Sequence, residues 1–125
     1  MKKNNKKGFT LAELLIVVAI IAVLVAISIP VFTSQLERAR EATDLANIRA
    51  AYAEVMTDYL AAGANTEKSS GPITIQQKDA EWHIDHNLNT RINGSESNYT
   101  IPSVPVGGKV IVSVSATGQV SVASA

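Results

Sequence analysis

The sequence predicts an α+β fold, in which a long amino-terminal helix packs on a small antiparallel β-sheet. Three observations carry this prediction. No residue from Leu14 to Leu36 is charged. From there to Gly63, apolar residues recur at spacings of three and four, which is the spacing of one face of a helix. After Gly63, short segments alternate between apolar and polar residues and are separated by turn residues, as in antiparallel strands.

This pattern divides the chain into four parts. We expect a leader at residues 1–8, a membrane-spanning half of the helix at 9–32, an amphipathic half at 33–62, and a β-region at 63–125 that forms a globular head with 33–62. The chain contains no cysteine, so a disulfide and a thiolate metal site are both impossible. A head of roughly 90 residues must therefore be held by its core, by the helix or by neighbours in an assembly.

The apolar run has the features of an export signal. It follows four lysines, Lys2, Lys3, Lys6 and Lys7. Basic residues in front of an apolar segment stay on the cytoplasmic side of the membrane, and Leu14–Phe32 is close to the ~20 residues that a helix needs to cross a bilayer. Glu13 is the only charged residue inside the apolar block. A carboxylate there costs roughly 3 kcal/mol or more and usually marks function.

Two plainer interpretations of this run remain open. It is either a cleavable secretory signal, with small residues in Ala26-Ile27-Ser28 for a signal peptidase, or a simple signal-anchor helix. Against the first, the apolar region is longer than the usual ~7–15 residues. Neither interpretation explains Glu13.

A specific resemblance lies in Lys6–Leu14, which reads Lys-Lys-Gly-Phe-Thr-Leu-Ala-Glu-Leu. This stretch resembles the prepilin signal of type IV pilins and the related pseudopilins, and the match extends to Phe32, about a quarter of the chain. In that family a prepilin peptidase cuts after the glycine on the cytoplasmic side and methylates the new amino terminus. The resemblance implies cleavage between Gly8 and Phe9 and N-methylation of Phe9.

Glu13 matches the family's glutamate five residues into the mature chain. It follows Phe9 by one helical turn, and a carboxylate in the first turn also suits the positive end of the helix dipole. In an assembly of staggered helices, Glu13 would pair with the Phe9 amine of a neighbour. An unpaired buried charge is strongly destabilising, so this pair would set the register. The alternative is that Glu13 pairs with the amine of its own chain.

Pro30 lies inside the apolar helix, where it removes a backbone hydrogen bond and clashes with the preceding turn. We expect a kink near Ala26–Ile29. By resemblance, Pro30 matches a proline common in these pilins, around which the helix can unwind in a filament. The plainer alternative is an ordinary membrane-helix kink.

The second half of the helix is predicted to be amphipathic. Its apolar stripe consists of Leu45, Ile48, Tyr52, Val55, Met56 and Tyr59, for which we expect core packing. Two ion pairs are expected at helical-neighbour spacing, Arg38–Glu41 and Arg40–Asp44. Gly63 is expected to end the helix as its C-cap.

The carboxyl-terminal region contains weaker signals. Residues 64–72 read as a loop, 73–77 and 81–84 as short strands, and 87–98 as a polar, turn-rich segment with a tight turn at Asn93-Gly94. The clearest pattern is a β-hairpin, with strands at 109–115 and 119–122 joined by a turn at 116–118. We expect a single small sheet laid on the helix stripe.

No motif points to catalysis, a cofactor or a metal. In a strand, His83 and Asp85 would share one face and His86 would lie on the other, so a two-histidine grip is not expected. Asn93 and Asn98 each begin an N-x-Ser/Thr tripeptide, and such tripeptides are frequent by chance. We therefore expect neither catalytic, cofactor-binding nor metal-binding residues, and no enzyme.

The predicted function is that of a structural subunit of a type IV pilus or pilus-like filament, processed after Gly8. The alternatives are a pseudopilin of a protein-secretion or DNA-uptake system, and a membrane-anchored exported binding domain that never polymerises. The implied partners are further copies of the chain, a prepilin peptidase, a membrane platform protein, an assembly ATPase and the cytoplasmic membrane.

Without the leader, the chain has seven basic and eleven acidic residues. This acidic balance argues against direct nucleic-acid binding. The protein would move from the cytoplasmic membrane into an extracellular filament.

Overall fold

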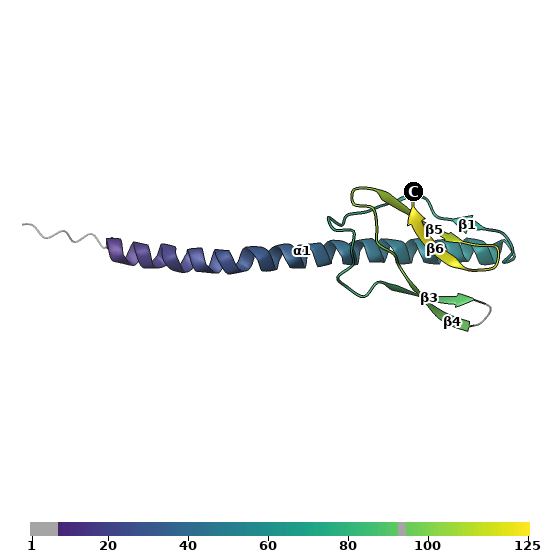
Figure 1. The fold of residues 1–125 in the computed structure, drawn as a ribbon, viewed down its shortest axis with the longest axis horizontal. Helices are drawn as coiled ribbons and strands as arrows, with labels where there is room; N and C mark the ends of the chain where they lie inside the picture. Colours follow the sequence, from purple (N-terminus) through teal and green to yellow (C-terminus); the bar gives the residue numbers. More distant parts are fainter. Residues whose placement is uncertain (1–7, 93–94) are drawn as a thin grey trace, which may run out of the picture. The chain divides into compact units, whose positions relative to one another are not determined.

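The computed structural model describes residues 8–92 and 95–125, which form one long helix followed by six strands (Figure 1). The elements are α1 (Leu11–Ala61), β1 (Lys68–Ser69), β2 (Ile73–Thr74), β3 (Asn87–Ile92), β4 (Ser95–Thr100), β5 (Lys109–Val114) and β6 (Val120–Ser124). The chain separates into two compact units, Met1–Gln35 and Leu36–Ala125. The long helix and the small antiparallel sheets confirm the predicted α+β class.

α1 ends at a glycine, as the sequence predicts. The Gly63 amide donates to the Leu60 carbonyl at 3.2 Å, and the Ala64 amide donates to the Tyr59 carbonyl at 3.0 Å. This pair of bonds is the Schellman arrangement, which satisfies carbonyls that the last turn leaves open. Gly63 has a φ of 86°, which a glycine adopts without the steric cost that a side chain would add.

The predicted apolar stripe of α1 forms one side of the core of the second unit. Its buried members are Leu45, Ile48, Ala51, Val55 and Tyr59, while Tyr52 and Met56 are half-buried against them. The stripe prediction is therefore confirmed, with Ala51 added. Ile48 is fully buried, so its loss would leave a cavity in the centre of the head.

The main sheet is organised around β5. β6 pairs with one edge of β5, and β1 and β2 pair one after the other along its opposite edge. Val110, Val112 and Val114 are buried, whereas the residues between them are partly exposed. The hairpin of β5 and β6 has the predicted alternation, and its turn closes with the Gly118 amide donating to the Ser115 carbonyl at 2.9 Å.

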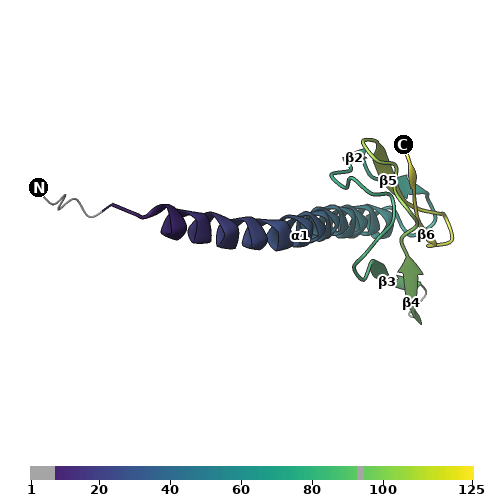
Figure 2. The same cartoon turned by 60° about the vertical axis from the view of Figure 1, so that its left-hand side comes forward.

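A second, separate sheet contradicts the expectation of a single one. β3 and β4 pair as a two-stranded antiparallel ribbon from Asn87↔Thr100 to Ile92↔Ser95, and both views show it apart from the strands around β5 (Figures 1 and 2). The sequence suggested a polar, turn-rich segment here because asparagine is typical of turns. Leu88 and Thr90 are nevertheless buried. The polar residues between them occupy the exposed face of a strand. The predicted turn at residues 93–94 lies outside the described residues.

Two shorter predictions were also wrong. Residues 81–84 form no strand, and β1 lies within the expected loop 64–72. The segment around Trp82 is held by other bonds. The Trp82 indole nitrogen donates to the Pro102 carbonyl at 2.9 Å, and the Val104 amide donates to the Ala80 carbonyl at 3.1 Å. Side-chain and loop contacts thus replace the strand pairing that the sequence suggested.

A hydrogen bond joins the ribbon to the main sheet. The Val122 amide of β6 donates to the Tyr99 hydroxyl of β4 at 3.0 Å. β6 pairs only with β5 among the strands of the described residues, so this amide belongs to a sheet edge. The Tyr99 hydroxyl takes the place that a further strand would fill.

Candidate functional site

The amino-terminal part of α1 presents an uninterrupted apolar surface. Every Leu, Ile, Val and Phe from Leu11 to Phe32 is exposed. A window of the helix is long and apolar enough to cross a membrane, and none of that window is buried within the chain. A soluble monomer rarely exposes so large an apolar patch. Lipid or other protein chains must therefore cover this surface.

Glu13, the one charge in this surface, caps the start of the helix. The Glu13 amide donates to the Thr10 hydroxyl at 3.1 Å, and the Thr10 amide donates to Glu13 Oε2 at 3.3 Å. This reciprocal pair is a capping box, in which the first turn satisfies two of its own open amides. This use of Glu13 was not predicted from the sequence, although Thr-x-x-Glu ahead of an apolar run is the signature of a capping box. Glu13 Oε2 is thus engaged locally.

The predicted cleavage site is exposed and lies just before the helix. Gly8 and Phe9 precede α1, and Phe9 is 82% exposed. A Cβ built at Gly8 would meet no atom within 4 Å, and the φ of Gly8 is not in the left-handed region, in contrast to that of Gly63. The fold therefore does not require glycine at position 8. If glycine is required at position 8, the requirement comes from another molecule that binds this segment.

α1 continues through Pro30 without a break. On either side of it, Ser28 Oγ donates to the Leu24 carbonyl at 2.7 Å and Thr33 Oγ1 donates to the Ile29 carbonyl at 2.9 Å. Bonds of this kind compete with the helical ladder and often bend helices. The kink in the turn before Pro30 stays a prediction, which Ser28, Pro30 and Thr33 favour.

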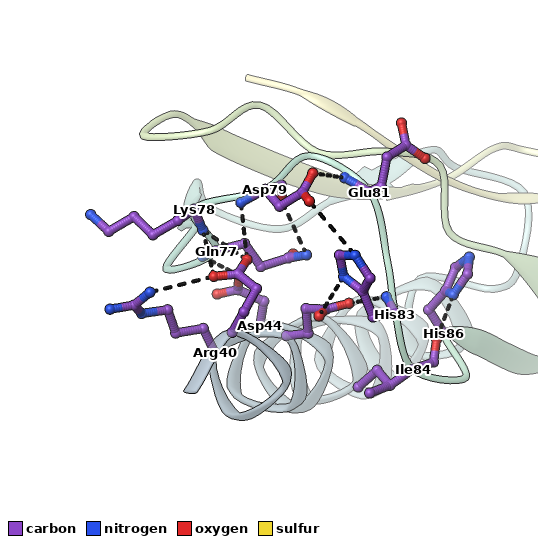
Figure 3. Close-up of polar contacts among 11 residues, drawn as sticks. Arg40, Asp44, Gln77, Lys78, Asp79, Glu81, His83, Ile84 and His86 are labelled. Atoms are coloured by element: carbon purple, nitrogen blue, oxygen red, sulfur yellow. Dashed lines mark hydrogen bonds and ion pairs between the residues drawn. The ribbon is translucent and has the colours of Figure 1, made fainter. Parts of the chain in front are cut away.

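In the second unit, three carboxylates of α1 hold loop 76–83 by its backbone amides (Figure 3). We call this set the carboxylate clamp: Glu37, Glu41 and Asp44. Its members are spaced by four and three residues and therefore share one face of the helix. Asp44 Oδ1 accepts from the Gln76 amide at 2.8 Å, and Asp44 Oδ2 accepts from the Gln77 amide at 2.9 Å. Glu37 Oε1 accepts from the amides of Lys78 and Asp79, each at 2.9 Å.

Glu41 completes the clamp through His83. One Glu41 carboxylate oxygen accepts the His83 amide, and the other lies 3.0 Å from His83 Nδ1. His83 Nε2 lies 3.6 Å from Asp79 Oδ2. Glu41 is completely buried whereas His83 is exposed, so the histidine covers the carboxylate from the solvent side. The clamp positions a loop that has no secondary structure of its own.

The clamp overturns both predicted ion pairs. Glu41 and Asp44 turn toward the loop, and Arg40 instead pairs with Glu37 at 3.4 Å. A carboxylate that is fully buried needs hydrogen-bond donors beside it, and the backbone amides of the loop are already fixed next to Glu41 and Asp44. The signal was available in the sequence, because Glu41 and Asp44 continue the apolar stripe toward its amino-terminal end.

Burial raises the pKa of the Asp44 carboxyl above its ordinary value, and the charges of Glu37 and Glu41 act in the same direction. The amide donors of Gln76 and Gln77 act in the opposite direction, because they stabilise the ionised form. The effect of burial is larger than that of the amide donors, so the net pKa of Asp44 is raised. The native state therefore binds the Asp44 proton more tightly than the unfolded chain does.

This raised pKa predicts how stability changes with pH. The part of the free energy of unfolding that is linked to protonation of Asp44 is fully present below the unfolded-state pKa and is lost as the pH rises through the native pKa. The variant Asp44→Asn carries a side-chain amide at this position, which does not titrate. We expect the melting temperature of the wild type to fall relative to that of Asp44→Asn between about pH 4 and pH 7, as measured by Trp82 fluorescence in detergent. A relative rise would contradict the assignment.

The segment Trp82–His86 is not a strand, so the predicted division of its faces does not apply. The His86 ring stacks on Trp82 with a centroid distance of 5.3 Å, and His86 Nδ1 lies 2.8 Å from the Ile84 carbonyl. Asp85 Oδ1 accepts from the side-chain amide of Asn87, Nδ2, at 2.7 Å. These side chains serve local packing and hydrogen bonding.

Comparisons with known proteins identify one family motif and several similar curated proteins. Residues 3–29 match the family described as the prokaryotic N-terminal methylation motif. The chain is 39% identical over 79 residues to a fimbrial protein of Dichelobacter nodosus, covering 61% of this chain and 49% of that protein. It is 38% identical over 79 residues to a type IV major fimbrial protein, FimA, of the same organism, with the same coverage. The chain thus spans about half the length of these curated relatives. No solved structure matches it.

Proposed function

We infer that this chain, which carries the methylation motif and is similar to fimbrial proteins, is a structural subunit of a type IV pilus or a pilus-like filament. The relatives are named as fimbrial proteins and not as enzymes, in keeping with a structural role. The observation that carries the proposal is the exposed apolar surface of residues 11–32 with Glu13 as its only charge. Such a surface is stable in a membrane and equally in the core of a helical assembly.

The leader is removed by a prepilin peptidase between Gly8 and Phe9, and Phe9 is then N-methylated. Two features support this proposal. The site is exposed ahead of the helix, where an enzyme can reach an unpaired backbone. Gly8 serves no purpose in the fold itself, so recognition by an enzyme accounts for it.

Once Phe9 is the first residue, its amine is a cation beside an apolar helix. In the filament, Glu13 of one subunit pairs with the Phe9 amine of a neighbour. The capping box occupies only one of the two Glu13 oxygens, so Oε1 can accept the neighbour's amine while the helix start remains capped. Since a mismatched register leaves both charges buried and unpaired, the pair selects one stagger between subunits.

Before processing, the chain crosses the cytoplasmic membrane once, with the lysines of the leader inside and the head outside. Extraction into an extracellular filament requires a membrane platform and an ATPase, and further copies of the chain cover the apolar surface. The alternative within the same family is a pseudopilin, which would use the same processing and pairing in a short filament for protein secretion or DNA uptake. The filament length in cells distinguishes the two.

The processing proposal is tested by the amino terminus of the protein recovered from cells. We expect the intact mass and the amino-terminal peptide to correspond to a chain that starts at N-methyl-Phe9. The variant Gly8→Val should remain uncut, with a head as stable as that of the wild type, because the added side chain meets nothing in the fold. A chain that starts at Ile29 would indicate an ordinary secreted domain. An uncut wild-type chain would indicate a simple anchor.

A further inference from the structure

We propose that the heads of neighbouring copies join through opposite flanks of α1, with Arg49 of one copy paired with Glu54 of the next. The basic flank consists of Arg38 and Arg49, and the acidic flank consists of Glu54 and Asp58. All four residues are exposed. The partner that this surface fits is therefore a second copy of the chain.

The helical repeat places the two flanks on different sides of α1. Arg38 and Arg49 are eleven residues apart, which is about three turns, so they lie on the same side. Glu54 and Asp58 are about one turn apart and also share a side. Arg49 and Asp58 are nine residues apart, or about two and a half turns, so the basic and acidic flanks lie roughly opposite each other.

The acidic flank is placed unfavourably in a free subunit. Glu54 and Asp58 are like charges at i, i+4 spacing, which destabilises a helix. Asp58 also lies in the last turn, where a negative charge opposes the helix dipole, and that turn contains no basic residue. Arg40 lies on the same side of α1, but it pairs with Glu37. Neither Glu54 nor Asp58 has a hydrogen bond or an ion pair from its side chain to another described residue, so a cation from outside the chain would relieve both effects.

The basic flank has donors available for such a contact. Arg49 Nη2 donates to the Asn87 carbonyl at 3.3 Å, which leaves further N–H groups of the guanidinium for a carboxylate. Arg38 has no ion pair with another described residue, because Glu41, its predicted partner, bonds to His83 instead. The basic flank thus offers cations that the head itself does not neutralise.

The positions of these charges favour a repeating contact over a closed dimer. In a two-fold dimer the same patch of both copies meets. A two-fold dimer through either flank would therefore bring like charges together. When the copies point the same way, the basic flank of each meets the acidic flank of the next, and the contact repeats without closing. Repetition of this kind produces a filament.

The spacing along α1 agrees with the proposed filament, on which this inference rests. There, Glu13 pairs with a neighbour's Phe9 amine, four residues earlier in the chain, which corresponds to a displacement of roughly 6 Å. Glu54 likewise follows Arg49 by five residues, a displacement of roughly 7–8 Å. In both pairs the acidic residue follows its partner by about one turn. Both pairs therefore require nearly the same shift between neighbouring copies.

The test is charge reversal in the full chain, with sheared filament compared with subunit in the membrane fraction. Like charges brought together across an interface are strongly unfavourable, so Glu54→Arg should lower the filament yield by roughly tenfold or more. The double variant Arg49→Glu/Glu54→Arg should recover most of the yield. The head of Glu54→Arg should be at least as stable as that of the wild type, because the like-charge contact with Asp58 is removed. The matched control is Glu81→Arg, which makes the same change of charge at another exposed position and should leave the yield unchanged.

Disulfide cross-linking tests the same contact without relying on charge. The chain contains no cysteine, so the variant Arg49→Cys/Glu54→Cys introduces its only two thiols. Residues five apart on a helix have Cα atoms roughly 8–9 Å apart, too far for a disulfide, so a bond must join two chains. We expect oxidised filaments of the double variant to give a ladder of covalent oligomers, and each single cysteine variant to give monomers.

A normal filament yield from Glu54→Arg, or dimers from a single cysteine variant, would overturn the inference. Glu54 has no bond of its own to lose in the described head, so its variant is not confounded by misfolding. The wild type keeps the two proposals apart. Wild-type filaments together with an unaffected Glu54→Arg contradict only the flank pairing, whereas the absence of wild-type filaments contradicts the proposed function.

Discussion

Replacing Glu13 with alanine should lower the yield of filaments by roughly a hundredfold or more, because leaving a buried charge unpaired costs about 3–5 kcal/mol. In the variant the Phe9 amine enters the apolar assembly without a partner. Cleavage and membrane insertion should continue, since neither needs the pairing between subunits. The measurement is filament sheared from the cells compared with subunit in the membrane fraction.

The variant Glu13→Gln separates the two uses of this side chain. Glutamine keeps an oxygen for the Thr10 amide, and so preserves the capping box, but it carries no charge. We expect Glu13→Gln to lose filaments almost as severely as Glu13→Ala. Thr10→Val, which removes only the hydroxyl of the cap, should cost about 1 kcal/mol of helix stability and leave assembly largely intact. Normal filaments from Glu13→Gln would show that capping, and not charge pairing, is the role of Glu13.

The second large effect is expected at Asp44. The variant Asp44→Ala leaves the Gln76 and Gln77 amides without their acceptor. Gln77 is buried and Gln76 is exposed, so water can replace the acceptor only for Gln76. A buried amide left unpaired costs about 1–3 kcal/mol, and we expect the free energy of unfolding of the head to fall by roughly that amount. Denaturant unfolding followed by Trp82 fluorescence measures the change.

Asp58 provides the matched control for Asp44. It is an exposed aspartate on the same helix, and Asp58→Ala should change the stability by no more than about 0.5 kcal/mol. Equal effects of the two substitutions would refute the clamp. Asp44→Asn should be intermediate, because its amide keeps one acceptor oxygen but turns a donor toward the remaining amide.

The elements predicted correctly are those whose signal is periodic and local. The stripe from Leu45 to Tyr59 repeats with the helical period over four turns, and the valines of β5 and β6 alternate without exception. The helix end is equally local, since Gly63 alone supplies the left-handed residue. Each of these choices is made by neighbours in the chain.

The elements that were missed depend on partners far away in the sequence. Loop 76–83 bonds to side chains more than thirty residues earlier. The sequence places Glu41 and Asp44 on the buried face of the helix, but it does not show which distant amides they accept. The β3–β4 ribbon was hidden by its asparagines, whose turn propensity is overridden when Leu88 becomes buried. At the candidate site, Gly8 and Phe9 were singled out by resemblance and Glu13 also by its charge in an apolar run. The capping box has a sequence signature, but it was recognised only from the geometry.

The bond between Tyr99 and Val122 bears on which part of the subunit can polymerise. An open strand edge is a template on which further chains add without limit, and β6 has a short, uncharged edge of Val, Ser and Ala. The Val122 amide at the centre of that edge already donates to the Tyr99 hydroxyl. This amide is therefore not available to pair with an approaching strand. Copies of the head are thereby discouraged from joining sheet to sheet. In the proposed filament, growth would then be left to the helices.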